Sequence, residues 1–459
     1  MKINVSYDPA SLNISAAFTA AVNTAVSLLD SLFQNTASLN IVVGWGIVKG
    51  QPLAPGTLGQ NSTNLVGDTY AATKAAILAT DGAWHSDNPA LTPFLPTTYP
   101  IANATVGIAT SEAKALGLIA ASSSIDGYVG INSTANWAYN ENGTIGSGQY
   151  DLVSTIIHEV TEVMGRISDL GVDGFYTAMD LFRYSSTGVL NTAPGGANST
   201  AYFSTDGGAT HLGTWNNNPS NGDFGDWYPQ GPGVGGYDAA NDYATPGHFA
   251  PLSQVDLTLM DALGWNTLKQ NVRVSDQTTM TAVVAPLKLY ADSDPGLNFQ
   301  YDYHGTDKVN VDALVSNQFV LTGSGDDAIN FSQVSGKNVL DGGTGSNFLV
   351  GCLDPTSQDT FYIDDRAPQA DIWTSVINLH KGDDVTIWGL TPTTGSVAWA
   401  NNEGAVGYTG LTAHVTSPGH PTASLTLTGL STADLSNGHL SISYGSVDGI
   451  PYLYIHDLL

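Results

Sequence analysis

The stretch Ile157-His158-Glu159-Val160-Thr161-Glu162-Val163-Met164-Gly165 decides how the first half of this 459-residue chain is interpreted. His158 and Glu162 are separated by about one helical turn, so both side chains would lie on one face of a helix. Glutamate is scarce, with five residues among 41 acidic ones, and two of the five are in this stretch. The spacing is that of H-E-x-x-H zinc-binding helices, with a carboxylate in place of the second imidazole.

Hydrophobic periodicity predicts a helix over residues 150–167 around this motif. Its apolar residues fall on one broad arc, whereas His158, Glu159, Glu162 and Arg166 fall on the opposite arc. Gly165 allows the helix to end tightly. The alternative interpretation is that this arc is only the solvent-exposed face of an amphipathic helix.

In the metal-site interpretation, His158 and Glu162 are ligands and Glu159 is the general base that activates a metal-bound water. A zinc site needs at least three protein ligands. We expect Asp180 to be the third, because a carboxylate in the apolar run 178–184 needs a partner. Asp169 ranks second, and His211 and His248 are further candidates. One imidazole with two carboxylates would hold Zn²⁺, and would also tolerate Mn²⁺ or another divalent ion.

Composition excludes some classes of function. The chain has 13 Lys plus Arg, 41 Asp plus Glu and a net charge of −28, which excludes a nucleic-acid partner. Its single cysteine, Cys352, cannot form an internal disulfide. No secretory signal peptide follows Met1, and the stretch 14–33 is too polar for a membrane span, so it is expected to be an amphipathic core helix.

Residues 1–268 are predicted to form one mixed α/β domain. The expected strands cover 2–7, 39–45 and 125–132, and the expected helices cover 15–33, 70–79, 111–120, 150–167 and 252–265. The loop-rich segment 191–246 contains Asp223-Phe224-Gly225-Asp226-Trp227, Asp238 and Asp242. These acids could line a cleft, bind Ca²⁺ or form ordinary Asx turns.

The second half is predicted to consist of short strands and turns. Residues 322–330 and 342–350 approximate the nonapeptide of calcium-binding parallel β-rolls. Asp327 and Asn347 would be the calcium ligands, and Ile329 and Leu349 would fill the core. The two copies are 20 residues apart where regular stacking requires 18, so the roll is expected to be short and degenerate. The alternative is a Gly- and Asp-rich turn region without calcium.

Several blocks together resemble a known family. Residues 158–166, 180–185, 202–208 and 222–227 are similar to the active-site helix and following blocks of bacterial secreted metalloprotease-like proteins. The second half is similar to RTX-type modules of proteins exported by type I secretion. The resemblance implies an α+β, zincin-like domain (1–268), a degenerate RTX-like β-roll (269–370) and a C-terminal β module with a secretion signal (371–459).

We therefore expect a secreted metal-dependent endopeptidase that requires Zn²⁺ or Mn²⁺, and Ca²⁺. It would be a monomer, exported by type I secretion machinery without a cleaved N-terminal signal. A protein or peptide substrate would lie along strand 125–132 by β-augmentation. A hydrolase of non-peptide substrates would use the same residues. The main alternative is a non-enzymatic, calcium-stabilised surface protein that contacts its partners through loop aromatics: Trp137, Trp215, Trp227, Tyr228 and Tyr237.

Overall fold

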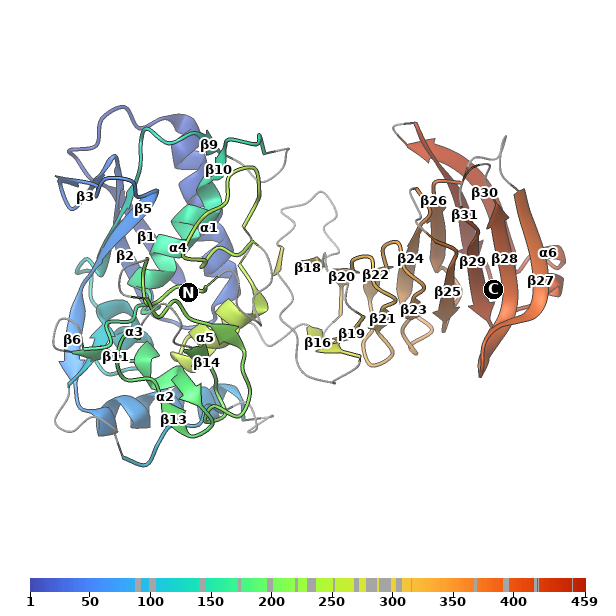
Figure 1. Ribbon diagram of the computed structural model, residues 1–459. Helices are drawn as coiled ribbons and strands as arrows, with labels where there is room; N and C mark the ends of the chain where they lie inside the picture. The colour runs from blue at the N-terminus through green and yellow to red at the C-terminus, as the bar shows by residue number, and fades with distance from the viewer. Residues whose placement is uncertain are drawn as a thin grey trace. The chain divides into compact units, whose positions relative to one another are not determined.

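The computed structural model divides the chain into two compact units, Met1–Leu268 and Lys269–Leu459 (Figure 1). The expected domain boundary lies between residues 268 and 269. It falls in the segment 268–271, which is outside the described residues. The structure describes residues 1–86, 92–98, 105–139, 145–171, 175–195, 201–218, 222–228, 237–250, 252–267, 272–277, 287–288, 299–302, 308–314, 316–366, 370–390, 396–416, 419, 421–447 and 449–459.

A four-stranded sheet forms the centre of the N-terminal unit, in the order β1-β2-β8-β5. Its strands are β1 (Lys2–Tyr7), β2 (Ser38–Trp45), β8 (Gly127–Ile131) and β5 (Gly59–Thr63). β1, β2 and β8 are parallel, and β5 runs antiparallel to β8 at one edge. The helices α1 (Ala16–Leu32) and α4 (Leu152–Val163) pack on each other, and α4 also contacts β5 and β8. The fold of this unit is therefore mixed α/β, as the sequence predicts.

The remaining elements of this unit are one long helix, α2 (Tyr70–Trp84), and several short helices and strands. The short helices are α3 (Thr110–Ala115), η2 (Met179–Phe182) and α5 (Gln254–Ala262). The strands are β3 (Ile47–Val48), β4 (Gln51–Pro52), β6 (Leu65–Asp68), β7 (Val106–Ala109), β9 (Trp137–Ala138), β10 (Tyr150–Asp151), β11 (Tyr176–Thr177), β12 (Arg183–Ser186), β13 (Val189–Leu190), β14 (Tyr202–Phe203) and β15 (Gly213–Thr214). Among the described residues, no helix is both long and apolar enough to cross a membrane.

Two eight-stranded sheets form the C-terminal unit, in the orders β16-β19-β21-β23-β25-β29-β28-β27 and β17-β18-β20-β22-β24-β26-β31-β30. The strands are β16 (Val272–Asp276), β17 (Leu287–Lys288), β18 (Phe299–Asp302), β19 (Val309–Ala313), β20 (Gln318–Leu321), β21 (Ala328–Asn330), β22 (Lys337–Asp341), β23 (Phe348–Val350), β24 (Gln358–Asp364), β25 (Ile372–Ile377), β26 (Asp384–Trp388), β27 (Ser396–Ala405), β28 (Tyr408–Thr416), β29 (Ala423–Thr428), β30 (Leu440–Val447) and β31 (Ile450–Asp457). One short helix, α6 (Thr432–Ser436), lies between β29 and β30. From β18 to β26, the chain alternates between the two sheets. Each strand up to β24 pairs in parallel with the strand two places further along the chain, so the chain winds as a two-sided coil.

Successive turns of this coil differ in length. Asn310 lies opposite Ala328, Ala328 opposite Phe348, and Phe348 opposite Ser375. The 20-residue separation of the two predicted repeats is thus accommodated as one longer turn. Ile329 and Leu349 are paired and fully buried, as expected for core positions.

The expected separate module 371–459 is not a unit of its own. Both sheets run across that boundary, because β25 pairs with β23 and β29, and β26 pairs with β24 and β31. The coil therefore continues without a break into the antiparallel strands at its end. Pairing changes from parallel to antiparallel within this one unit, since β26 pairs in parallel with β24 and antiparallel with β31.

Candidate active site

Helix α4 positions the H-E-x-x-E motif by packing its apolar side into the core. It begins after Asp151, whose side chain accepts a hydrogen bond from the backbone N–H of Ser154 at 3.2 Å, as an N-cap does. It ends at Met164, because Gly165 has a φ of +110°. A side chain at Gly165 would also meet the carboxylate of buried Glu112 at 2.5 Å.

The polar side of α4 is not a solvent-exposed face. Glu159, Glu162 and Arg166 are 5%, 3% and 0% exposed. The alternative interpretation of this arc as an ordinary wet surface is therefore wrong. These charges are covered on both sides, by strand β5 and by residues 223–228 and 237–242.

His158, Glu159 and Glu162 come together as the sequence predicts, with one candidate ligand atom of each within 4.8 Å of the others. His158 Nε2 is 3.6 Å from Glu162 Oε1. His158 Nδ1 lies 2.9 Å from the carbonyl oxygen of Ala239. Because a carbonyl only accepts hydrogen bonds, Nδ1 carries the proton, and Nε2 is left to bind a cation.

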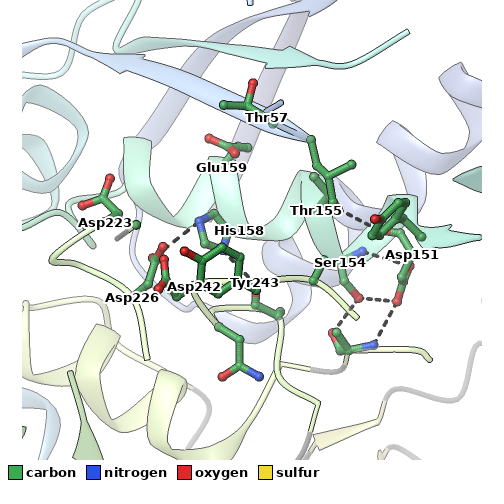
Figure 2. Close-up of a pocket in the computed structure, with 18 of the residues that line it drawn as sticks. Thr57, Asp151, Ser154, Thr155, His158, Glu159, Asp223, Asp226, Asp242 and Tyr243 are labelled. Atoms are coloured by element: carbon green, nitrogen blue, oxygen red, sulfur yellow. Dashed lines mark hydrogen bonds and ion pairs between the residues drawn. The ribbon is translucent and has the colours of Figure 1, made fainter. Parts of the chain in front are cut away.

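Asp226 brings a further carboxylate to His158. Its Oδ1 is 3.5 Å from His158 Nε2, and Figure 2 shows the two side chains pointing at each other. Arg166 Nη1 is 3.2 Å from the same oxygen. The sequence leaves open whether motif 222–227 lines a cleft, binds calcium or forms ordinary Asx turns, and it does not predict the contact of Asp226 with His158.

An aromatic anchor holds the Asp226 loop in place. Trp227 stacks on Trp215 with ring centroids 4.0 Å apart, and its Nε1 donates to Asp256 Oδ1 at 2.6 Å. Arg166 donates to the carbonyl oxygen of Ala240 at 3.1 Å and lies over the Trp227 ring. Since Trp215 and Trp227 are buried, as is Trp137, these three cannot contact a partner, whereas Tyr228 and Tyr237 are exposed.

Asp180 does not take part in the cluster, contrary to the expectation from the sequence. It lies in the 3₁₀ helix η2, and it accepts hydrogen bonds from Ser168, Leu170 and Thr177. Its carboxylate thus finds the partners that burial demands in its own loop. Neither Asp169 nor His211 lines the cavity described below, and His248 lies on its rim, stacked on Tyr237.

The cluster opens onto a cavity of about 690 Å³. One wall is β5 with the residues before it, and the opposite wall carries Asp223, Asp238, Asp242 and Tyr243. Figure 2 shows Glu159 on the strand side of α4 and His158 on the loop side. A substrate in this cavity would lie between an edge strand and a strongly acidic loop.

Strand β5 is fitted closely to the two glutamates. The Asn61 amide donates to Glu162 and, at 3.4 Å, to Glu159. A Cβ at Gly59 would be 2.3 Å from Glu159 Oε1, so only glycine leaves room for this carboxylate. Neither residue was predicted; in the sequence Gly59-Gln60-Asn61-Ser62-Thr63 is simply a polar stretch.

The outer edge of the sheet is β5, and the expected substrate strand is not an edge. β8 pairs with β2 on one side and β5 on the other, so it has no free edge for a peptide. No described strand pairs with the second edge of β5. Leu58 O accepts from Asn132, and Asn64 N donates to Asp126, so the backbone groups of the alternate residues Gly59, Asn61 and Thr63 point outward.

The cluster carries more negative charge than the protein neutralises. Burial, and then the charge of Glu162, raises the pKa of Glu159 well above its usual range. Burial raises the pKa of Asp226 to about 6, although His158 opposes the rise. Burial lowers the pKa of His158, but the charges of Asp226 and Glu162 outweigh it and raise this pKa well above its usual range. Protons thus supply the positive charge that a divalent ion could supply instead, so the residues fit a cation.

No family model matches the chain, and neither a curated protein nor a solved structure was found to be similar to it.

Proposed function

We propose that the N-terminal unit is a metal-dependent endopeptidase of zincin-like type. The observation that carries this proposal is the meeting of His158 Nε2 with carboxylate oxygens of Glu162 and Asp226, at 3.6 and 3.5 Å, beside Glu159 and a cavity. One nitrogen and two carboxylates suit Zn²⁺ or Mn²⁺. Such an ion would polarise a carbonyl group and lower the pKa of a water molecule.

Glu159 is the general base in this proposal. It lies next to the candidate ligands but on the β5 side of the helix, where Asn61 holds it. Its raised pKa suits a group that takes a proton from water and returns it to the leaving amine. Arg166 and Ala239 position Asp226 and His158 from the opposite side.

The substrate is a peptide segment in extended conformation. The free edge of β5 offers backbone groups of Gly59, Asn61 and Thr63, and this edge borders the cavity that contains Glu159. An extended peptide could pair with this edge by β-augmentation, which would place its backbone across the cluster. Peptide binding thus moves from the predicted strand 125–132 to β5.

The C-terminal unit is proposed to be an RTX-like β-roll that folds with Ca²⁺ outside the cell after type I secretion. The parallel two-sided coil supports this proposal. Asp327 is the better calcium candidate, since its Oδ1 accepts from Val309 at 2.9 Å and its second oxygen has only the Thr322 hydroxyl nearby. Asn347 already donates to the carbonyl oxygens of Gly342 and Gly345, at 2.7 and 3.0 Å, so it satisfies these oxygens without an ion.

The test is hydrolysis of unfolded casein by the full chain loaded with Zn²⁺ or Mn²⁺. Glu159→Gln should lower the rate at least about 100-fold, because the general base is lost, while metal content by elemental analysis stays the same. Glu403→Gln, in the C-terminal unit, is the matched control and should keep full activity. Equal activity of wild type and Glu159→Gln, or a metal-loaded wild type that cleaves no peptide in a broad library, would rule the proposal out.

A further inference from the structure

A second cluster of metal-ligand side chains lies between helices α2 and α5. Asp81 and His85 are one turn apart at the C-terminal end of α2, and Asp261 is in the last turn of α5. One candidate ligand atom of each lies within 4.8 Å of the others. His85 Nε2 is 2.6 Å from Asp261 Oδ2 and 3.6 Å from Asp81 Oδ1. None of the three residues lines the cavity beside His158.

Asp81 is the side chain that indicates a missing ligand. It is 2% exposed, and neither of its oxygens makes a hydrogen bond of ordinary geometry within the described residues. Burial raises the pKa of Asp81 to about 6, and the nearby Thr92 hydroxyl and His85 counter this rise only in part. A buried carboxylate with so few donors is costly, so Asp81 needs a positive charge beside it.

His85 alone does not meet this need. An imidazolium supplies one positive charge, and here it faces two carboxylates. It lies closer to Asp261, which is also positioned by Thr267: Thr267 Oγ1 donates to Asp261 Oδ1 at 3.1 Å. Asp81 Oδ1, in contrast, is 3.6 Å from His85 Nε2. An ion pair between His85 and Asp261 would thus leave the negative charge of buried Asp81 without compensation.

We propose that Asp81, His85 and Asp261 bind a second divalent cation of the Zn²⁺ class. One imidazole and two carboxylates are a donor set that zinc accepts, with water at a remaining position. Calcium would need six to eight oxygen ligands, more than these three residues provide. The ion would tie the end of α2 to α5, and α5 carries the Asp256 that accepts from Trp227. Its role is therefore structural, and it supports the helix on which the Asp226 loop rests.

The test counts bound Zn²⁺ in the full chain. Protein stripped of metal is reloaded with Zn²⁺, desalted and analysed for zinc per chain. Asp81→Asn keeps the shape of the side chain, and it should bind one Zn²⁺ fewer than wild type. His211→Gln, which removes an exposed histidine elsewhere in this unit, should bind as much as wild type. The same difference of one ion should persist when both chains also carry Glu162→Gln, which separates this site from the first cluster.

Thermal unfolding gives a second readout. Zn²⁺ should raise the Tm of the Glu162→Gln chain by several degrees, and Asp81→Asn should abolish most of this rise. If Asp81→Asn does not fold, the same count on His85→Gln decides. Equal zinc content with and without Asp81, or with and without His85 where that variant is used, would overturn the proposal.

Discussion

The two units bury acidic and amide side chains in opposite ways. Beside α4, the carboxylates of Glu162 and Asp226 both approach His158, and Glu159 lies close to Glu162. In the coil, buried side chains of this kind face backbone N–H groups instead: Asp359 accepts from Cys352 at 2.6 Å, and Asn347 accepts from Asp327 at 2.8 Å. The difference teaches that a buried carboxylate indicates an ion site only where the protein does not provide its donors.

The largest expected effect comes from exchanging carboxylates for amides at two buried aspartates. Asp226→Asn should lower peptidase activity at least about 100-fold and weaken Zn²⁺ binding by a similar factor, because it removes a negative charge beside His158 Nε2. Asp180→Asn should bind Zn²⁺ as wild type does, since Asp180 serves only the loop around Ser168 and Thr177. Elemental analysis and casein hydrolysis measure both effects.

The same two variants also decide whether Asp180 or Asp226 is the third metal ligand. If Asp180→Asn loses the metal while Asp226→Asn keeps it, the sequence-based choice is right, and the contact of Asp226 with His158 only orients the ring. Asp180→Asn is expected to lower stability modestly, because an amide cannot accept all three hydrogen bonds. Thermal unfolding separates that loss from a loss of metal.

The sequence predicts the helix and its three motif residues well, because both depend on local spacing. The period of the apolar residues fixes which side of α4 packs against α1 and the sheet. What periodicity cannot show is the depth of burial: Arg166 and Glu162 were placed on a possible wet face, yet both are buried. Burial there depends on a loop more than 50 residues away, Trp227 and its neighbours.

The place of Asp226 beside His158 could not be predicted for the same reason. Asp180 was favoured because a carboxylate in an apolar run needs a partner, whereas Asp226 was grouped with the acids of a loop-rich segment. Only tertiary contacts distinguish them, since the Trp215–Trp227 stack brings Asp226 to His158. The edge position of β5 is likewise a property of sheet order, which a strand pattern alone does not give. In the coil, by contrast, the repeat register was visible in the sequence, because Ile329 and Leu349 occupy equivalent positions in paired strands.

A smaller effect is expected at Gly59, where Glu159 has room only because this residue has no side chain. Gly59→Ala should lower peptidase activity by about 10- to 100-fold, because its methyl group would displace Glu159, and a shift of about 1 Å at a catalytic group can cost 100-fold. Metal content should remain unchanged, since the three atoms nearest a Cβ at Gly59 all belong to Glu159, which is not a proposed ligand. Gly148→Ala is the control, because a Cβ there meets only Asn136, at 3.9 Å. Full activity of Gly59→Ala would show that Glu159 is not held where the reaction requires it.

The smallest effect tests the coil. Asn347→Asp replaces the amide that donates to Gly342 and Gly345 with a group that can only accept. Without calcium, the variant should lose about 1–3 kcal/mol of unfolding free energy, because two buried carbonyl oxygens lose their donor and face a negative charge. Millimolar Ca²⁺ should restore much of this loss, since the carboxylate and the carbonyls then form an oxygen site like that of the consensus repeat. Urea unfolding with and without Ca²⁺ measures both changes, and Asn401→Asp on the surface of β27 controls for the added charge. If calcium stabilises wild type and Asn347→Asp equally, the Asn347 amide does not take the place of a calcium ion in this turn. The proposed difference between the coil and the α4 pocket would then be wrong at this position.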